Sequence, residues 1–177
     1  MKKYEFTGET KEIRLLFRTA TLHRIRATVA FGIVEVGDLG GWIEKEENLS
    51  HEGKAWVWGN AKVWGNAKVC GDAEVWGNAE VCGDAEVCGD AKVFSASHVL
   101  VIGAIGSRND FTTFYRDKDN EITVKCGCFL GKIDRFLEKV TQTHGDSKYA
   151  LVYRAAVEVA KLQIDLSGEA PKDADEE

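Results

Sequence analysis

One six-residue unit recurs without a gap from Ala55 to Leu100, and it constrains the fold more than any other feature of the chain. The stretch reads AWVWGN AKVWGN AKVCGD AEVWGN AEVCGD AEVCGD AKVFSA SHVL. Valine occupies the third position of every unit, and alanine precedes it by two in every unit except the last, which has Ser97. A period this short and regular predicts a solenoid.

Within each unit, four residues alternate as they do in a strand, and two more form a turn. Ala and Val fall on one side of the strand, whereas Lys or Glu and Trp or Cys fall on the other. Gly-Asn or Gly-Asp follows, and these residues tolerate the positive φ of tight turns. Because so short a strand cannot bury its own valine, successive strands must wind into a coil with every Val and Ala on a shared axis.

The unit resembles the hexapeptide repeat of left-handed parallel β-helices, in which three units form one 18-residue triangular coil. The left hand is implied by the resemblance alone. Residues 18 apart would then be stacked neighbours, and unlike charges stabilise such pairs. The charged neighbours have opposite signs, Lys62 with Glu80, Lys68 with Glu86, and Glu74 with Lys92. Asp72 over Asp90 is the exception, at a hydrated turn.

The flanks of the repeat predict two further parts. Residues 1–38 are expected to form an N-terminal β cap, because 12–18 and 22–29 alternate as the strands of a hairpin do. The parallel β-helix is expected over 39–100, with an irregular first coil that buries Leu39, Ile43 and Leu49, each 18 residues before a repeat core position. Open solenoid ends expose core and strand edges, so both flanks are expected to act as caps.

Beyond Leu100, the sequence predicts a C-terminal α+β module over 101–166 in the order ββαα. Strands are expected at 111–116 and 121–126, and residues 103–110 (GAIGSRND) are expected to form a loop. Two amphipathic helices follow, the second over about 146–164. Residues 167–177 (SGEAPKDADEE) are expected to be a disordered acidic tail. The fold class is therefore mainly β.

Composition excludes several classes of function. The net charge of −6 argues against general nucleic-acid binding through a basic surface. No apolar segment follows the first three residues as it would in a signal peptide, and no run reaches transmembrane length. The five cysteines, three of them in the repeat, suggest free thiols in a reducing compartment. We therefore expect a cytoplasmic protein that does not contact membranes.

Five arginines are candidates for anion binding. Four lie in the predicted hairpin and one in the glycine-containing loop, namely Arg14, Arg18, Arg24, Arg26 and Arg108. Guanidinium groups bind phosphate well, and backbone N–H groups of such a loop can add to the site. The alternatives are that the hairpin arginines pair with Glu44, Glu46, Glu47 or the acidic tail, and that the loop only turns the chain.

Neither a catalytic centre nor a metal site is predicted. Known hexapeptide β-helices include trimeric acyltransferases with a histidine general base, but the repeat carries no inserted loop for a substrate pocket. His98 occupies a structural position above Glu80. Cys126 and Cys128 supply only two soft ligands, too few for a structural zinc site. We expect no cofactor and no enzymatic activity, and an acyltransferase-like enzyme is the alternative.

The outward aromatic residues of the repeat predict an interface. Trp58, Trp76 and Phe94 fall 18 residues apart in one column, with Trp56 beside them. A contiguous apolar strip invites association, so these four residues are expected to be covered. The cover could be a flanking part of the chain, a second subunit or a foreign partner. A homo-oligomer, with a trimer favoured, is the expected assembly.

The whole chain resembles a family of small bacteriophage and prophage proteins of Gram-positive hosts. The resemblance rests on five segments, LHRIRA-x-x-x-FG from residue 22, GDLGGWIEKEENLS at 37–50, the GNA/GDA repeats, IGSRND-FTTFYRD, and CGCFLGKIDRFLEKV with THGDSKYA. It implies a non-enzymatic binding or scaffold protein in the host cytoplasm. The expected partner is a host protein, possibly one of antiviral defence, or a nucleotide messenger that the protein sequesters.

Overall fold

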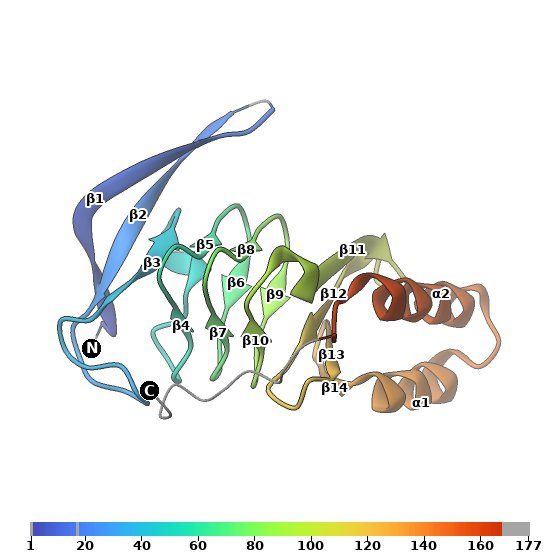
Figure 1. The fold of residues 1–177 in the computed structure, drawn as a ribbon. Coiled ribbons are helices and arrows are strands. Elements are labelled where there is room, and N and C mark those ends of the chain that lie inside the picture. Colours follow the sequence, from blue (N-terminus) through green and yellow to red (C-terminus); the bar gives the residue numbers. More distant parts are fainter. Residues whose placement is uncertain (1, 17, 168–177) are drawn as a thin grey trace.

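The computed structural model describes residues 2–16 and 18–167. The chain is mainly β and has three parts in sequence order, a long hairpin, a stack of short strands, and a module with two helices (Figure 1). Most of the expected acidic tail, from residue 168 on, lies outside the described residues. Among the described residues, no helix combines the length and the apolar character needed to cross a lipid bilayer.

The repeat forms a coil of two-residue strands whose revolutions are 18 residues long. Its strands are β4 (Trp56–Val57), β5 (Lys62–Val63), β6 (Lys68–Val69), β7 (Glu74–Val75), β8 (Glu80–Val81), β9 (Glu86–Val87) and β10 (Lys92–Val93). Parallel pairing joins β4 to β7 to β10, β5 to β8, and β6 to β9. The repeat alanines and valines from Ala55 to Val93 are at most 1% exposed, so they form the core.

At Gly65 and Gly71, the turns of successive revolutions approach so closely that only glycine fits. The repeat glycines have positive φ, +71° at Gly65 and +70° at Gly71. A Cβ atom on Gly71 would lie 2.8 Å from the backbone nitrogen of Gly89, closer than real contacts allow. Any side chain there would push adjacent revolutions apart and break their parallel hydrogen bonds.

The first revolution is longer than the others. It contains β3 (Leu39–Ile43) and the short 3-10 helix η1 (Glu46–Asn48). Ile43 pairs with Val63 and Leu49 with Val69, both 20 residues apart. These two side chains are buried as expected, but Leu39 is 47% exposed, so its predicted place in the core is wrong. A strict 18-residue period would place Leu39 beneath Val57 in the core, and the observed offset of 20 residues moves it away from that position.

The N-terminal hairpin extends one sheet of the coil. Its strands β1 (Tyr4–Arg14) and β2 (Thr19–Ala27) are antiparallel, and β2 pairs with β3, which gives the order β1-β2-β3-β5-β8. The far end of the hairpin projects as an arm (Figure 1). At its base the buried Tyr4 hydroxyl donates to the carbonyl of Leu49 at 2.9 Å. The hairpin therefore covers the open end of the stack, as a cap does.

The C-terminal module begins with a four-stranded antiparallel sheet. After the short 3-10 helix η2 (Ala96–His98), the sheet contains β11 (Val99–Ile105), β12 (Asp110–Arg116), β13 (Ile122–Cys126) and β14 (Phe129–Lys132). Helices α1 (Ile133–His144) and α2 (Lys148–Gln163) follow. The expected order ββαα is corrected, because β11 and β14 were not predicted. Residues 103–105 belong to β11 rather than to a loop, and β14 pairs with β13 through a turn at Gly127.

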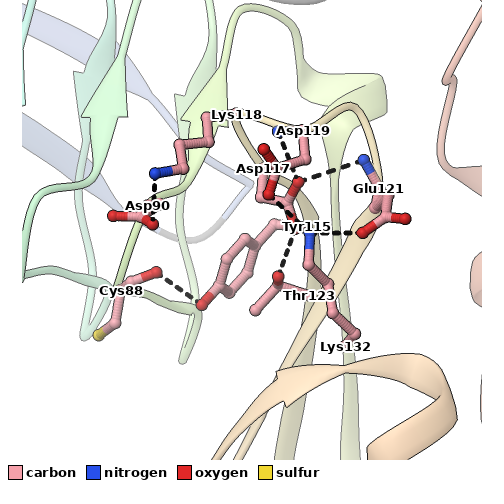
Figure 2. Close-up of polar contacts among 9 residues, drawn as sticks. All are labelled: Cys88, Asp90, Tyr115, Asp117, Lys118, Asp119, Glu121, Thr123 and Lys132. Atoms are coloured by element: carbon pink, nitrogen blue, oxygen red, sulfur yellow. Dashed lines mark hydrogen bonds and ion pairs between the residues drawn. The ribbon is translucent and has the colours of Figure 1, made fainter.

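Contacts of Tyr115 and Lys118 fix this module to the last revolution of the coil, and a network within the module centres on Asp117 (Figure 2). The Tyr115 hydroxyl donates to the Cys88 carbonyl at 2.7 Å, and Lys118 pairs with Asp90 at 3.1 Å. Asp117 is buried beside them. It accepts from Thr123 Oγ1 at 2.6 Å and from Lys132 Nζ at 2.5 Å. A buried carboxylate with this many donors holds the β12–β13 turn in one geometry.

Candidate functional site

The arginines of the hairpin are each engaged or lie apart, and they do not converge on one point. Arg18 pairs with Glu44 through both guanidinium nitrogens, the longer contact being 3.1 Å. Hydrogen bonds from Arg18 hold the pKa of Glu44 below its usual value. Arg26 contacts Glu5 at 2.6 Å.

Two further arginines of the hairpin complete this picture. Arg24 lies 3.5 Å from Glu9 and over the ring of Trp42, with its guanidinium carbon 5.6 Å from the ring centroid. Arg14 is exposed at the end of β1. Since these groups are mostly neutralised by carboxylates of the same chain, the hairpin offers little free positive charge to an anion.

An aromatic ladder, formed by Trp58, Trp76 and Phe94, runs along the outside of the coil. The two indole rings stack at 4.4 Å between centroids with planes 12° apart, and Phe94 follows at 6.2 Å. All three side chains remain partly exposed. The Trp76 indole N–H donates to Glu74 at 2.8 Å, and Glu74 pairs with Lys92 at 2.6 Å. The predicted column therefore exists, with a polar border beside it.

Trp56 does not belong to this surface, which corrects its assignment to the interface. Its side chain is fully buried, at 0% exposure. The ring of Phe31 lies 5.4 Å away edge-on, and Tyr4 lies at 6.3 Å. The N-terminal segment thus covers the one unit whose second position holds Trp instead of Lys or Glu.

The repeat cysteines also differ from expectation. Cys70 and Cys88 form a disulfide, and their Cα atoms are 4.6 Å apart. Free thiols were predicted for both, and the bond follows from their places one revolution apart in the same column. Cys82, Cys126 and Cys128 are free.

The histidines mostly serve structural contacts. His98 is buried and accepts from the Phe94 N–H at 3.2 Å, while Arg116 lies 3.4 Å from its other nitrogen. Burial and the charge of Arg116 lower the pKa of His98, so its ring stays neutral near pH 7. His51 accepts from the Lys3 N–H at 3.1 Å, and its pKa is lowered mainly by burial. His23 stacks on Phe6 at 4.7 Å.

A polar groove of about 520 Å³ lies between the coil and the module. Its walls carry acidic and basic side chains in nearly equal number, Lys45, Glu47, Lys68, Asp84, Glu86, Asp110 and Lys125. Lys125 pairs with Glu86 at 3.2 Å, and the Glu86 N–H donates to Thr113 at 3.0 Å. The positive and negative side chains of the groove therefore largely neutralise one another, and the groove favours neither an anionic nor a cationic ligand.

A second concavity, which we call the module pocket, has a volume of about 460 Å³ and lies wholly in the C-terminal module. Three segments far apart in the sequence meet there, residues 107–110, 126–129 and 139–144. The first two contain the IGSRND and CGC motifs, and the last reaches the start of THGD. Helix α2 contributes Tyr153. Arg108 is thus the predicted arginine that the structure places in a pocket.

Two glycines allow close packing around the module pocket. At Gly106, where φ is +74°, a Cβ atom would lie 1.9 Å from the Tyr153 hydroxyl. At Gly127, a Cβ atom would lie 2.9 Å from a guanidinium nitrogen of Arg108. The Cys126 thiol lies 3.9 Å from the Tyr153 hydroxyl and accepts from Thr112 at 3.3 Å. Burial and the neighbouring Cys126 raise the pKa of Tyr153 to about 12, so it stays protonated.

Sequence reasoning missed Lys139, His144 and Tyr153 as parts of this pocket. Their signal was present, because they lie in or beside the CGCFLGKIDRFLEKV and THGDSKYA segments on which the resemblance rests. Within 2–16 and 18–167, no three or more His, Cys, Asp or Glu side chains are grouped as metal ligands would be. Comparison with protein-family models and with curated proteins gave no match in either case.

Proposed function

We propose that this chain is a non-enzymatic binding protein of bacteriophage origin, built on a left-handed parallel β-helix and active as an oligomer. The observation that carries the proposal is the aromatic ladder, because it is a partly exposed apolar surface on a regular, closely packed coil. The coil supplies the scaffold, and the flanking parts supply the contacts with a partner.

The scaffold role is supported by continuity of packing. The revolutions stack in parallel register through β4-β7-β10, and the contacts of Tyr115 with Cys88 and of Lys118 with Asp90 join the last revolution to the module. Because each revolution touches only its neighbours, such a coil is stiff and extended. A left-handed winding is consistent with the Ala-x-Val-x-Gly-Asn/Asp unit, which resembles the repeats of left-handed members.

The occupant that we propose for the aromatic ladder is a second copy of the chain. Stacked indoles at 4.4 Å form a straight, flat strip along the coil, and a coil of three sheets suits three-fold assembly. The border formed by Glu74 and Lys92 carries both signs of charge, so it can be matched by a copy of itself. A trimer is the favoured assembly.

The partner class is proposed from the resemblance to phage proteins. A host protein of antiviral defence, or a nucleotide messenger held out of circulation, would both be bound without chemical change. An acyltransferase is the alternative: His98 and His51 direct ring nitrogens at backbone N–H groups of the same chain, and among the larger cavities of the described residues only the module pocket is lined by a histidine, His144. A general base needs a free nitrogen beside the substrate.

The test combines native mass with a ligand screen. Light scattering should give a multiple of the 19.5 kDa chain mass, and Trp76→Ala should lower that mass or weaken the assembly on dilution. Leu162→Ala, at another exposed apolar residue, is the matched control and should leave the mass unchanged. Melting should not shift with acyl-CoA. The proposal would be refuted if the wild-type chain were a monomer with the same melting temperature as Trp76→Ala. It would also be refuted if the protein transferred an acyl group from acyl-CoA.

A further inference from the structure

The module pocket combines positive charge with aromatic side chains, and both come from the C-terminal module. Arg108 and Lys139 lie at its edge, one from the β11–β12 turn and one from α1. Neither has a carboxylate within ion-pairing distance in the described part of the chain. Asp110 is the one carboxylate in the lining, so in a protein of net charge −6 the pocket keeps a local excess of positive charge that favours an anion.

The floor of the pocket is built from rings. Phe136 packs against Phe129 at 5.3 Å and against Tyr153 at 5.5 Å between centroids. His144 stacks on Tyr153 at 5.8 Å. Phe136 and Tyr153 are largely buried under the module core, so these ring positions are fixed before any ligand arrives. Preformed aromatic walls, with the partly exposed rings of Phe129 and His144 at the opening, favour a planar ligand ring over a flexible chain.

We propose that the module pocket binds a nucleotide, with the heterocyclic base on the aromatic floor and the phosphate between Arg108 and Lys139. The inference rests on the proposed binding function and names the ligand class and its site. A pocket of about 460 Å³ has the volume that a mononucleotide needs. Asp110, at the edge shared with the polar groove, is placed to accept from a ribose hydroxyl.

The rest of the molecule offers weaker sites for a phosphate. Three hairpin arginines face Glu5, Glu9 and Glu44, and the fourth, Arg14, is exposed at the end of β1 and lines none of the larger cavities of the described residues. In the polar groove, Lys125 is already paired with Glu86. Lys45 and Lys68 of that groove lie among Glu47, Asp84 and Glu86. In the module pocket, by contrast, a phosphate would meet Arg108 and Lys139 beside a single carboxylate, that of Asp110.

The experiment is titration calorimetry of the full chain with AMP, GMP, CMP and UMP, alongside adenosine, ribose 5-phosphate and inorganic phosphate. At least one nucleotide should bind with a Kd on the order of 10 µM, as expected for a ligand of that size. Removal of the base or of the phosphate should weaken binding about tenfold or more. Raising NaCl from 50 to 200 mM should weaken nucleotide binding and leave nucleoside binding unchanged.

Variants locate the site. Arg108→Ala should weaken nucleotide binding about tenfold, and Thr143→Trp should block it by filling the pocket from an exposed position on α1. Lys161→Ala removes the same charge from an ion pair on the exposed face of α2 and should stay within about twofold of wild type. All three substitutions are at surface positions, and equal melting temperatures would verify that each variant folds.

Three results would overturn the inference. These are failure of every nucleotide to bind at 1 mM, binding that survives both Arg108→Ala and Thr143→Trp, and a nucleoside that binds as tightly as its monophosphate. The proposed function fails on different grounds, since it depends on assembly through the aromatic ladder. An intact oligomer that ignores nucleotides would remove the ligand assignment and leave the protein-partner version of the binding role.

Discussion

Val75 lies at the centre of the coil, so truncating it measures how much the stacked core contributes to stability. Its side chain is 0% exposed and is in register with Val57 in the revolution before it and Val93 in the one after. Val75→Ala removes two methyl-sized groups from this column. The lost transfer free energy is about 1.6 kcal/mol, at about 0.8 kcal/mol per buried group. The cavity left between close-packed revolutions adds roughly 1 kcal/mol.

We therefore expect Val75→Ala to lower the free energy of unfolding by about 2–3 kcal/mol. The assay is urea unfolding followed by tryptophan fluorescence, which reports on the ladder beside Val75. Val36→Ala is the matched control, because it makes the same chemical change at a valine that is 67% exposed. The control should change stability by less than about 0.5 kcal/mol.

The reasoning would be refuted if the two variants had the same urea midpoint. That outcome would mean that Val75 is not enclosed by neighbouring revolutions. Val75→Asp extends the test, because an unpaired charge on the coil axis costs several kcal/mol or forces protonation of the new carboxyl. Soluble, fully folded protein from that variant at neutral pH would also contradict the coil.

Lys3 predicts a pH effect: burial lowers its pKa to about 8, with its ammonium 2.7 Å from the Ala55 carbonyl. The unfolded chain keeps this proton up to about pH 10.5, so the free energy of unfolding should rise by about 1–3 kcal/mol between pH 8 and 10. Urea midpoints should show this rise in wild type and not in Lys3→Met. An equal rise in both proteins would show that other groups cause it. Cys88→Ser opens the 18-residue loop closed by the disulfide with Cys70 and should lower stability by about 3 kcal/mol under oxidising conditions. Dithiothreitol should lower the melting temperature of wild type and leave this variant unchanged, whereas equal sensitivity would contradict a role for the disulfide.

Much of the repeat region could be predicted because two spacings in its sequence each determine part of the structure. The six-residue spacing gives the inward Ala and Val, and the 18-residue spacing gives the stacked neighbours. Lys62 pairs with Glu80 at 2.5 Å, as the charge pattern indicated. Lys68 and Glu86 are in register but form no such pair, because Lys125 of the module engages Glu86. A partner from a distant segment cannot be inferred from the repeat itself.

Three of the misses have separate causes. Trp56 has the outward position of its unit, yet Phe31 and Tyr4 bury it. Leu39 leaves the core because the first revolution takes 20 residues, which no repeat spacing records. β14 was missed because a four-residue strand leading directly into a helix has too little alternation to be recognised.

The candidate site was predictable only in part. Arg108 was recognised from its glycine-containing loop, but the spacing of Arg108, Lys139 and Tyr153 follows no local period. They meet because the sheet and two helices fold over one another, which places 107–110 beside 126–129 and α2. The one sequence signal for this pocket is that the segments carrying the family resemblance are short and separate, which suggests that they meet in the folded chain.

Native mass spectrometry of the purified full chain with an added nucleoside monophosphate tests the central claim, an oligomeric binding protein, most directly. The account predicts a species of three times the 19.5 kDa chain mass that gains nucleotide mass, with no chemical change in the released nucleotide. A single-chain species that carries no nucleotide would contradict it.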